Sequence, residues 1–579
     1  MRINHKTKVI LITLFCILTF GIFIGILGYK LSMPFQVSIY NYESYINKNI
    51  ERKLKKNYSY HVFTEINEFT KAINSQKAVA GVGSDHQIAQ LITEGKIQKI
   101  DFSIIYPDLF KDLNTKYETV LDYDCVEDKD NSEKTNKYKE YLKNKKQIIY
   151  NLYPSFVREH LDKYNEWLKD TVNQTNKKII KSPLGKVIYN LDLDEFYEYN
   201  VPYFVQDKMI TYNVNKTFKN HLNISSNIED NYDAFEFPKS GTIIENNKVV
   251  KYSTWLDILT TLNQKYNYKI FNWTNSFLDN TMIGETIDKD YWYDEKNKTW
   301  KNLDFSNYRK AVDDFMKIVQ KATGHSIRDI QYNKLITNGL ELVNSIIEPS
   351  KIKGDVSIMY NGDTLDSYYA EDNFASLGEI RQINYIRPKN NYLLMDAWII
   401  SHDVEKKSAE KLLKILKDDL FEGQDYSVEK LNKTYIEYIK NNLDENKKLQ
   451  LDELILKAQK IGLDSIQKLI QNPTKGFTSF YKENKDIFVD AMEFVPIISN
   501  FDAVNYTVPY QNLIEWLKDW YFLTINNQDN IEKDEAALNI FNISNVDKNG
   551  EIIYHRIYQP LPLKLKTLLT EYYFRETKS

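Results

Sequence analysis

One carboxylate of the chain, Asp396, stands inside a run of apolar residues. The run covers residues 392–400 and reads Tyr-Leu-Leu-Met-Asp-Ala-Trp-Ile-Ile, which is typical of a buried strand. A carboxylate in such a strand is costly unless a cation or hydrogen-bond donors compensate it. The cation is either internal, with Arg387 as the candidate, or it arrives with a ligand, and the sequence leaves both open.

Motifs for catalysis, for metal binding and for nucleotide binding are missing from the sequence. The histidines are scattered, and there is no His-Glu-x-x-His, Cys-x-x-Cys or Gly-x-x-x-x-Gly-Lys pattern. Residues 81–84, Gly-Val-Gly-Ser, lack the third glycine of a dinucleotide-binding turn and fit a short turn between a strand and a helix. We therefore expect a binding protein rather than an enzyme, with no metal and no cofactor.

Length and charge set broad limits on the class of protein. The chain has 579 residues, enough for two or more lobes, because a single hydrophobic core seldom exceeds about 300 residues. Its 76 Lys and Arg nearly balance its 80 Asp and Glu, so no global field favours nucleic acid as a partner. Specificity must therefore come from a local site.

The amino terminus has the pattern of a membrane anchor. Basic residues precede an uncharged run that is long enough to cross a bilayer at about 20 residues per span. We expect residues 1–8 in the cytoplasm, residues 9–29 in the cell membrane as a single-pass helix, and the chain after Lys30 outside the cell. A cleaved signal peptide and a lipoprotein attached at Cys16 are the alternatives, but no Ala-x-Ala site follows the run.

Beyond this run, strands and helices alternate. Residues 35–40 and 78–82 read as strands, and residues 86–94 read as a helix. Such a rhythm is typical of an α/β sheet with parallel strands. Two polar stretches, at about 116–192 and 418–486, interrupt this alternation of strands and helices and are predicted to be helical insertions on the surface.

Short segments of the chain resemble the spermidine/putrescine-binding proteins of bacterial ABC importers. The resembling segments are Ser-Ile-Tyr-Asn-Tyr-Glu-Ser-Tyr at 38–45, Gly-Lys-Ile-Gln-Lys-Ile-Asp at 95–101, Val-Pro-Tyr at 201–203, Met-Tyr-Asn-Gly at 359–362, Met-Asp at 395–396, Val-Asn-Tyr-Thr-Val-Pro at 504–509, Tyr-Gln at 558–559 and Glu-Tyr-Tyr at 571–573. The segments occur in the same order as in that family, and this order carries the resemblance.

The resemblance implies an α/β fold of the type II periplasmic-binding-protein kind, with two lobes, crossover strands near 206–212 and 395–400, and a ligand in the cleft between the lobes. It implies as partners ABC permease subunits and their ATPase. The implied boundaries are 35–206 and 396–515 for the first lobe, which would carry both insertions, and 207–395 and 516–579 for the second lobe.

The resemblance also implies which residues bind a polyamine such as spermidine or putrescine. Such a ligand needs carboxylates at its ammonium groups and aromatic faces along its alkyl stem. Asp396 would receive one ammonium group, and Asp279 would receive a second, with Asn275 as its neighbour. The other implied contacts are the rings of Tyr42, Tyr45, Tyr360 and Tyr506, the hydrogen-bonding groups of Ser84 and Gln559, and His86.

Two positions depart from the family pattern. Leu394 stands where the family commonly has tryptophan, and His86 where it commonly has tyrosine. If His86 lines the cleft, its protonation would repel a polycation, which predicts weaker binding as the pH falls through about 6.5. Two alternatives remain open: another cationic or small organic solute on the same fold, and a surface adhesion or scaffolding ectodomain that inherited the fold.

Overall fold

A computed structural model describes most of the chain. The described residues are 19–21, 36–64, 66–121, 132–174, 178–183, 185–213, 242–245, 248–252, 254–264, 267–294, 296, 299–348, 354–369, 383–388, 390–463, 466–526, 528–545 and 553–578. The predicted anchor at 9–29 falls almost entirely outside them. Within the described ranges, no helix combines the length and the apolar character that a membrane crossing requires.

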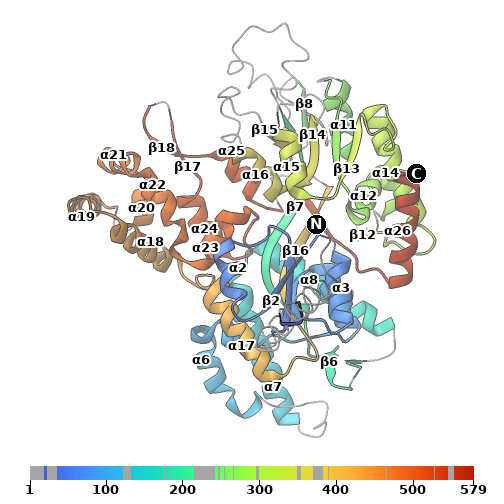
Figure 1. Cartoon of the computed structure of the whole chain (residues 1–579), viewed down its shortest axis with the longest axis horizontal. Coiled ribbons are helices and arrows are strands. Elements are labelled where there is room, and N and C mark those ends of the chain that lie inside the picture. The colour runs from blue at the N-terminus through green and yellow to red at the C-terminus, as the bar shows by residue number, and fades with distance from the viewer. Residues whose placement is uncertain are drawn as a thin grey trace, which may run out of the picture.

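The largest sheet has two parallel wings around an antiparallel centre (Figure 1). In the described residues its strands follow the order β13 (Asn333–Ile336), β10 (Phe271–Thr274), β14 (Val356–Tyr360), β7 (Val201–Asn213), β16 (Asn390–Ser401), β3 (Ala78–Ser84), β1 (Ser38–Tyr42) and β2 (Ser59–Phe63). Strand β15 (Ile383–Ile386) pairs with β7, and β19 (Tyr554–Ile557) and β4 (Ile97–Gln98) pair with β16. Strands β1, β2 and β3 are mutually parallel, as are β10, β13 and β14. Both wings meet the centre in antiparallel pairs. This arrangement confirms the predicted α/β class.

Two long strands pass from one wing to the other. Strand β7 (Val201–Asn213) pairs with β16 over its first half and with β14 and β15 over its second half. Strand β16 (Asn390–Ser401) pairs with β19 at its start and with β3 at its end. Nearly every residue of both strands is buried, since elements cover both faces, and this explains why neither strand alternates in polarity. The two lobes predicted from the sequence are therefore joined by crossover strands.

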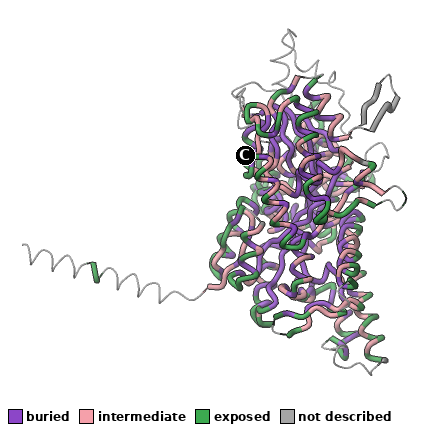
Figure 2. The backbone as a smooth tube through the Cα atoms, turned by 90° about the vertical axis from the view of Figure 1, so that its right-hand side faces the viewer, coloured by how far each residue is buried: buried purple, intermediate pink, exposed green. Residues whose placement is uncertain are grey.

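Each lobe has its own hydrophobic core. One core gathers side chains of β1, β3, the first half of β7, the end of β16 and the helices between 406 and 541. The other gathers side chains of β10, β14, the second half of β7, the start of β16 and the C-terminal helix. Figure 2 shows buried residues along the interior of both lobes.

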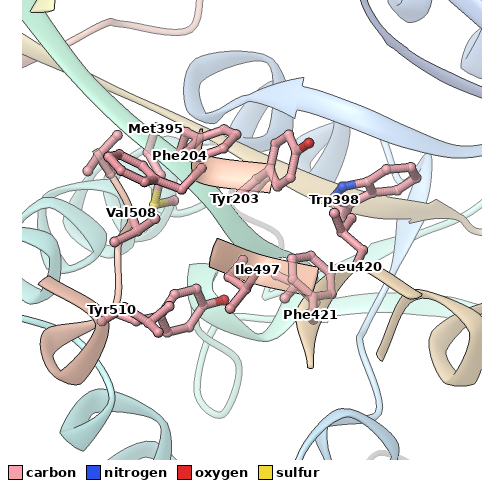
Figure 3. Packing of buried hydrophobic residues seen from close by; sticks show 14 of the residues in the cluster. Tyr203, Phe204, Met395, Trp398, Leu420, Phe421, Ile497, Val508 and Tyr510 are labelled. Carbon is pink, nitrogen blue, oxygen red and sulfur yellow. The ribbon is translucent and has the colours of Figure 1, made fainter. Parts of the chain in front are cut away.

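The helices of the second insertion are anchored on the crossover strands. Figure 3 shows Leu420 and Phe421, at the start of this insertion, close to Tyr203 of β7 and Trp398 of β16. The ring centroids of Tyr203 and Phe421 lie 6.4 Å apart. The inserted helices therefore continue the first core instead of lying loosely on its surface.

The bounds of the elements before residue 300 are β1 Ser38–Tyr42, α2 Lys48–Leu54, β2 Ser59–Phe63, α3 Ile66–Asn74, β3 Ala78–Ser84, α4 Asp85–Thr93, β4 Ile97–Gln98, α5 Phe102–Ile105, α6 Pro107–Lys116, η1 Glu118–Val120, α7 Ser132–Asn151, α8 Ser155–Gln174, β5 Ile179–Lys181, β6 Val187–Asn190, η2 Phe196–Tyr199, β8 Thr242–Glu245, β9 Lys248–Tyr252, α11 Trp255–Gln264, β10 Phe271–Thr274, α12 Phe277–Gly284, α13 Lys289–Trp292, β11 Tyr293–Asp294 and β12 Thr299–Trp300.

The bounds of the later elements are α14 Tyr308–Thr323, β13 Asn333–Ile336, α15 Gly339–Ile347, β14 Val356–Tyr360, α16 Asn361–Tyr369, β15 Ile383–Ile386, α17 Lys406–Leu416, η4 Lys417–Phe421, α18 Val428–Asn442, α19 Glu445–Lys460, α20 Ile466–Gln471, α21 Lys475–Glu483, α22 Lys485–Asp490, η5 Ala491–Phe494, α23 Pro496–Val504, α24 Gln511–Trp520, β17 Leu523–Ile525, β18 Ile531–Lys533, α25 Glu535–Phe541, β19 Tyr554–Ile557 and α26 Leu563–Lys578.

Candidate functional site

A cavity of about 520 Å³ lies between the two lobes. Its first wall comes from the turn after β1 and from the junction of β3 and α4. Its second wall comes from the ends of β10 and β14 and the helices that follow them, and β7 and β16 form its floor. The sequence-predicted residues that line it are Tyr42, Tyr45, Ser84, His86, Asn275, Asp279, Tyr360, Asp396 and Tyr506.

Asp396 is buried on the cavity floor and is held by neutral donors. Ser84 donates a hydrogen bond to its Oδ1 at 2.6 Å, and Tyr45 and Gln206 each donate to its Oδ2 at 2.8 Å. Ser84 is the cross-strand partner of Asp396, and the register of β16 on β7 shifts directly after Asp396. Such irregularities re-aim side chains. Three donors, from β3, from β7 and from the loop after β1, therefore fix the orientation of this carboxylate.

The internal alternative, a salt bridge between Asp396 and Arg387, does not form. The Nε atom of Arg387 lies 2.8 Å from Oδ2 of Asp207 instead. Among the residues that the structure describes, no Lys or Arg forms an ion pair with Asp396. The carboxylate is therefore oriented but not neutralised.

Burial raises the pKa of Asp396 to about 6, although its three hydrogen bonds oppose the shift. The nearby charge of Asp85 adds to the increase. Burial also opposes ionisation of Asp85, but the hydrogen bond to His160 and the nearby imidazole of His86 lower its pKa to about 2. A buried carboxylate with a raised pKa gains most when a cation binds beside it.

Helix α8, in the first predicted insertion, reaches the back of the cavity wall. His160 Nε2 lies 2.6 Å from Oδ2 of Asp85, and the same oxygen accepts the N–H of Met395 at 2.8 Å. One turn further along α8, Tyr164 donates a hydrogen bond to the carbonyl of Tyr558 at 2.7 Å. This insertion therefore supports the residues around the cavity.

Three tyrosines form an aromatic wall beside Asp396. The ring centroid of Tyr45 lies 5.5 Å from that of Tyr42 and 5.2 Å from that of Tyr506, and both pairs are edge to face. The hydroxyl of Tyr42 lies 2.9 Å from Oγ of Ser84. These contacts hold the rings in fixed positions, and their faces can bind an alkyl chain or an ammonium group.

Two further carboxylates, Asp363 and Asp366, line the cavity on α16. Tyr506 donates a hydrogen bond to Oδ1 of Asp363 at 2.6 Å. Burial raises the pKa of Asp363, and burial and the neighbouring Asp363 raise that of Asp366 to about 6. Gly362 makes the hydrogen bond between Tyr506 and Asp363 possible, since a Cβ atom at position 362 would lie 2.3 Å from the Tyr506 ring.

Asp279 is ion-paired, in contrast to Asp396. Nζ of Lys208 lies 2.6 Å from its Oδ2. Tyr558 donates a hydrogen bond to its Oδ1 at 2.7 Å, and Tyr360 donates to the same oxygen at 3.0 Å. Asp279 lines the cavity, as the sequence predicted, but a buried lysine of β7 already occupies the position beside it that a ligand amine would take.

His86 packs inside the cavity wall. Its ring stacks on that of Tyr558 with centroids 5.6 Å apart, and its Nδ1 lies 3.5 Å from Oδ1 of Asp85. Neither ring nitrogen makes a hydrogen bond with the described part of the chain. Both nitrogens are buried, so His86 borders the cavity, as the sequence suggested, mainly through its stacked ring.

Gln559 does not line the cavity, unlike the other predicted residues. Its amide donates a hydrogen bond to Asn302 on the outside, and the preceding residue, Tyr558, lines the cavity instead. Neighbouring residues of extended chain point to opposite sides, so an error of one position reverses the side chain. Asn275 is at the rim, where it donates a hydrogen bond to Oγ1 of Thr337 at 2.9 Å.

The sequence interpretation missed Gln206, Lys208, Asp363, Asp366 and Tyr558. The signal for Lys208 was the same as that for Asp396, a charge inside a buried strand, in the run Phe-Val-Gln-Asp-Lys-Met-Ile at 204–210. Asp363 and Asp366 follow the Met-Tyr-Asn-Gly segment and recur at helical spacing.

Comparisons with known proteins find similarity only to solved structures. No family model matches the chain, and no curated protein matches it. A protein assigned as a spermidine/putrescine ABC transporter from Listeria monocytogenes is similar at 11% identity and a TM-score of 0.43, over 93% of this chain and 98% of that one. The substrate-binding protein PotD from Streptococcus pneumoniae shares 11% identity over 93% and 98% of the two chains, with a TM-score of 0.38. The protein MotA from A. tumefaciens, in complex with glucopine, shares 10% identity over 87% and 99%, with a TM-score of 0.33. At these TM-scores the likenesses assign no ligand to this chain.

Proposed function

We propose that this chain is the extracytoplasmic solute-binding subunit of an ABC importer and that its ligand is an aliphatic polyamine. It acts as a binding protein and not as an enzyme, it delivers the ligand to permease subunits driven by a separate ATPase, and residues 9–29 tether it to the cell membrane. The co-linear segments that resemble polyamine-binding proteins support the importer part of this proposal.

The observation that carries the proposal is Asp396, a buried and oriented carboxylate on the floor of a cavity with aromatic walls. A carboxylate held by neutral donors, with no ion pair to any described residue, has a strong gain in free energy when an ammonium group arrives. Tyrosine faces beside it match the methylene stem of such a ligand. Asp363 on α16 offers a second carboxylate for the other end.

The geometry of the crossover strands suits a change of shape on binding. The walls of the cavity belong to different cores, and β7 and β16 connect them. A ligand that contacts Asp396 and Asp363 together would favour a closed arrangement of the lobes, because it binds that arrangement more tightly. Permease subunits would then recognise the closed form.

The experiment is isothermal titration of the purified full-length chain with spermidine, putrescine and cadaverine. We expect micromolar or tighter binding of at least one amine, no heat with 1,4-butanediol, and a loss of affinity of about 100-fold in Asp396→Ala, because a charge-assisted contact is removed. Asp329→Asn, which removes a carboxylate outside the cavity, serves as the control and keeps its affinity. A folded wild-type protein that gives no heat with any amine contradicts the proposal.

A further inference from the structure

The ammonium group of Lys208 is completely enclosed. Its side chain has an exposed fraction of 0%. Its Nζ lies 2.6 Å from Oδ2 of Asp279 and 2.7 Å from Oγ1 of Thr274, to which it donates a hydrogen bond. The centroid of the Tyr360 ring lies 3.5 Å from Nζ. A carboxylate, a hydroxyl and a ring face together satisfy this cation.

These three partners are also what a ligand ammonium group would need. Asp279, Thr274 and Tyr360 all line the cavity, whereas Lys208 lies behind them as the cross-strand partner of Tyr360. Burial lowers the pKa of Lys208, and the charge of Asp279 opposes this shift. The lysine thus depends on Asp279 for its charge, as a bound amine would.

We infer that Lys208 fills an ammonium subsite with the chain's own side chain and thereby makes the cavity selective for a diamine over a triamine. This inference rests on the proposed function and specifies its substrate class. A third ammonium group would meet a subsite that is already occupied and a positive charge directly behind it. The selectivity is thus set by exclusion as well as by contact.

Two other carboxylates that line the cavity could each bind an ammonium group. Asp396 and Asp363 form no ion pair with any residue that the structure describes, and each accepts a hydrogen bond from a tyrosine, Tyr45 and Tyr506 respectively. The rings of these tyrosines are in contact, so the carboxylates flank one aromatic surface. Asp366 lies one helical turn after Asp363 and acts on the same end of the ligand.

The test is calorimetry with putrescine and spermidine on the full-length protein and on two variants. We expect the wild type to bind putrescine at least about tenfold more tightly than spermidine. Lys208→Ala frees Asp279 and opens space beside the cavity, so spermidine should gain at least about tenfold relative to putrescine. Lys208→Ala/Asp279→Asn keeps the space but removes the carboxylate, and the gain should disappear.

The outcomes separate this inference from the proposed function. An unchanged ratio of the two affinities in Lys208→Ala overturns the inference and leaves amine binding intact, whereas no binding of either amine to any folded form removes the proposed function. If Lys208→Ala unfolds without ligand, its thermal melting is followed with each amine present. Spermidine should then restore the transition and putrescine should not, and equal behaviour of the two amines overturns the inference.

Discussion

Asp396 and Asp279 are two buried carboxylates on different sides of one cavity, and their environments differ in charge. Three neutral donors surround Asp396, whereas Lys208 forms an ion pair with Asp279. Neutral hydrogen bonds orient a carboxylate but leave its charge uncompensated, and an ion pair completes the compensation. The comparison separates a carboxylate whose charge is uncompensated from one whose charge is already compensated by an internal cation.

The largest expected effect concerns Asp279, the carboxylate that is paired with Lys208. Asp279→Asn leaves Lys208 buried without its carboxylate, which should lower the free energy of unfolding by about 3 kcal/mol. Asp396→Asn removes a charge that has no ion-pair partner among the described residues, so its effect should stay below about 1 kcal/mol. Urea unfolding followed by circular dichroism measures both.

A double variant serves as the control for this pair. Lys208→Met/Asp279→Asn removes both charges at nearly constant volume and should recover most of the lost stability. Equal destabilisation by Asp279→Asn and Asp396→Asn would show that the two carboxylates are not different in kind.

A second prediction concerns amine affinity and the two carboxylates of α16, Asp363 and Asp366. Asp363→Asn keeps the acceptor for Tyr506 but removes the charge, and we expect amine affinity to fall by about tenfold. Asp366→Asn, the matched variant one turn away, should cost only about threefold, because its carboxylate is less deeply buried than that of Asp363. Calorimetry gives both values, and a larger loss in Asp366→Asn would reverse the assignment of the two residues.

The pH dependence of binding tests the charge of Asp396. Because burial raises the pKa of this carboxyl to about 6, it is ionised at pH 7.5 and about nine-tenths protonated at pH 5. Only the ionised form attracts an ammonium group, so affinity should fall about tenfold as the pH falls through 6. Equal affinities at pH 5 and pH 7.5 would contradict this.

His86 and Asp366 complicate the attribution of that pH dependence. Protonation of His86 would also repel a cation, and burial raises the pKa of Asp366 to about 6 as well. His86→Gln and Asp366→Asn should each keep a midpoint near pH 6 if Asp396 dominates. A flat profile in either variant would assign the dependence to that residue.

The smallest expected effect concerns Gln559. Its side chain contacts Asn302 outside the cavity, so Gln559→Ala should change amine affinity by less than about twofold. Tyr558→Phe, at the neighbouring position, removes a donor to Asp279 and should have the larger effect. Titration calorimetry compares the two variants. A larger loss of affinity in Gln559→Ala would show that Gln559 belongs to the binding site.

Much of the fold follows from local patterns in the sequence. The alternation of strands and helices indicates an α/β fold, and the apolar run around Asp396 indicates a buried strand, because burial on both faces requires continuous apolar residues. The cost of a charge in that run identifies Asp396 as a residue with a specific partner. Segments that resemble a family place most of the candidate residues in one cavity.

The charge of each subsite was decided only by the tertiary structure. Arg387 pairs with Asp207 instead of Asp396, and Lys208 pairs with Asp279, which lies far from it along the chain. These pairings depend on the register of β7 against its neighbours, and register is a property of the assembled sheet. A sequence shows that a buried charge needs compensation, but which group supplies it depends on distances that exist only after the strands have paired.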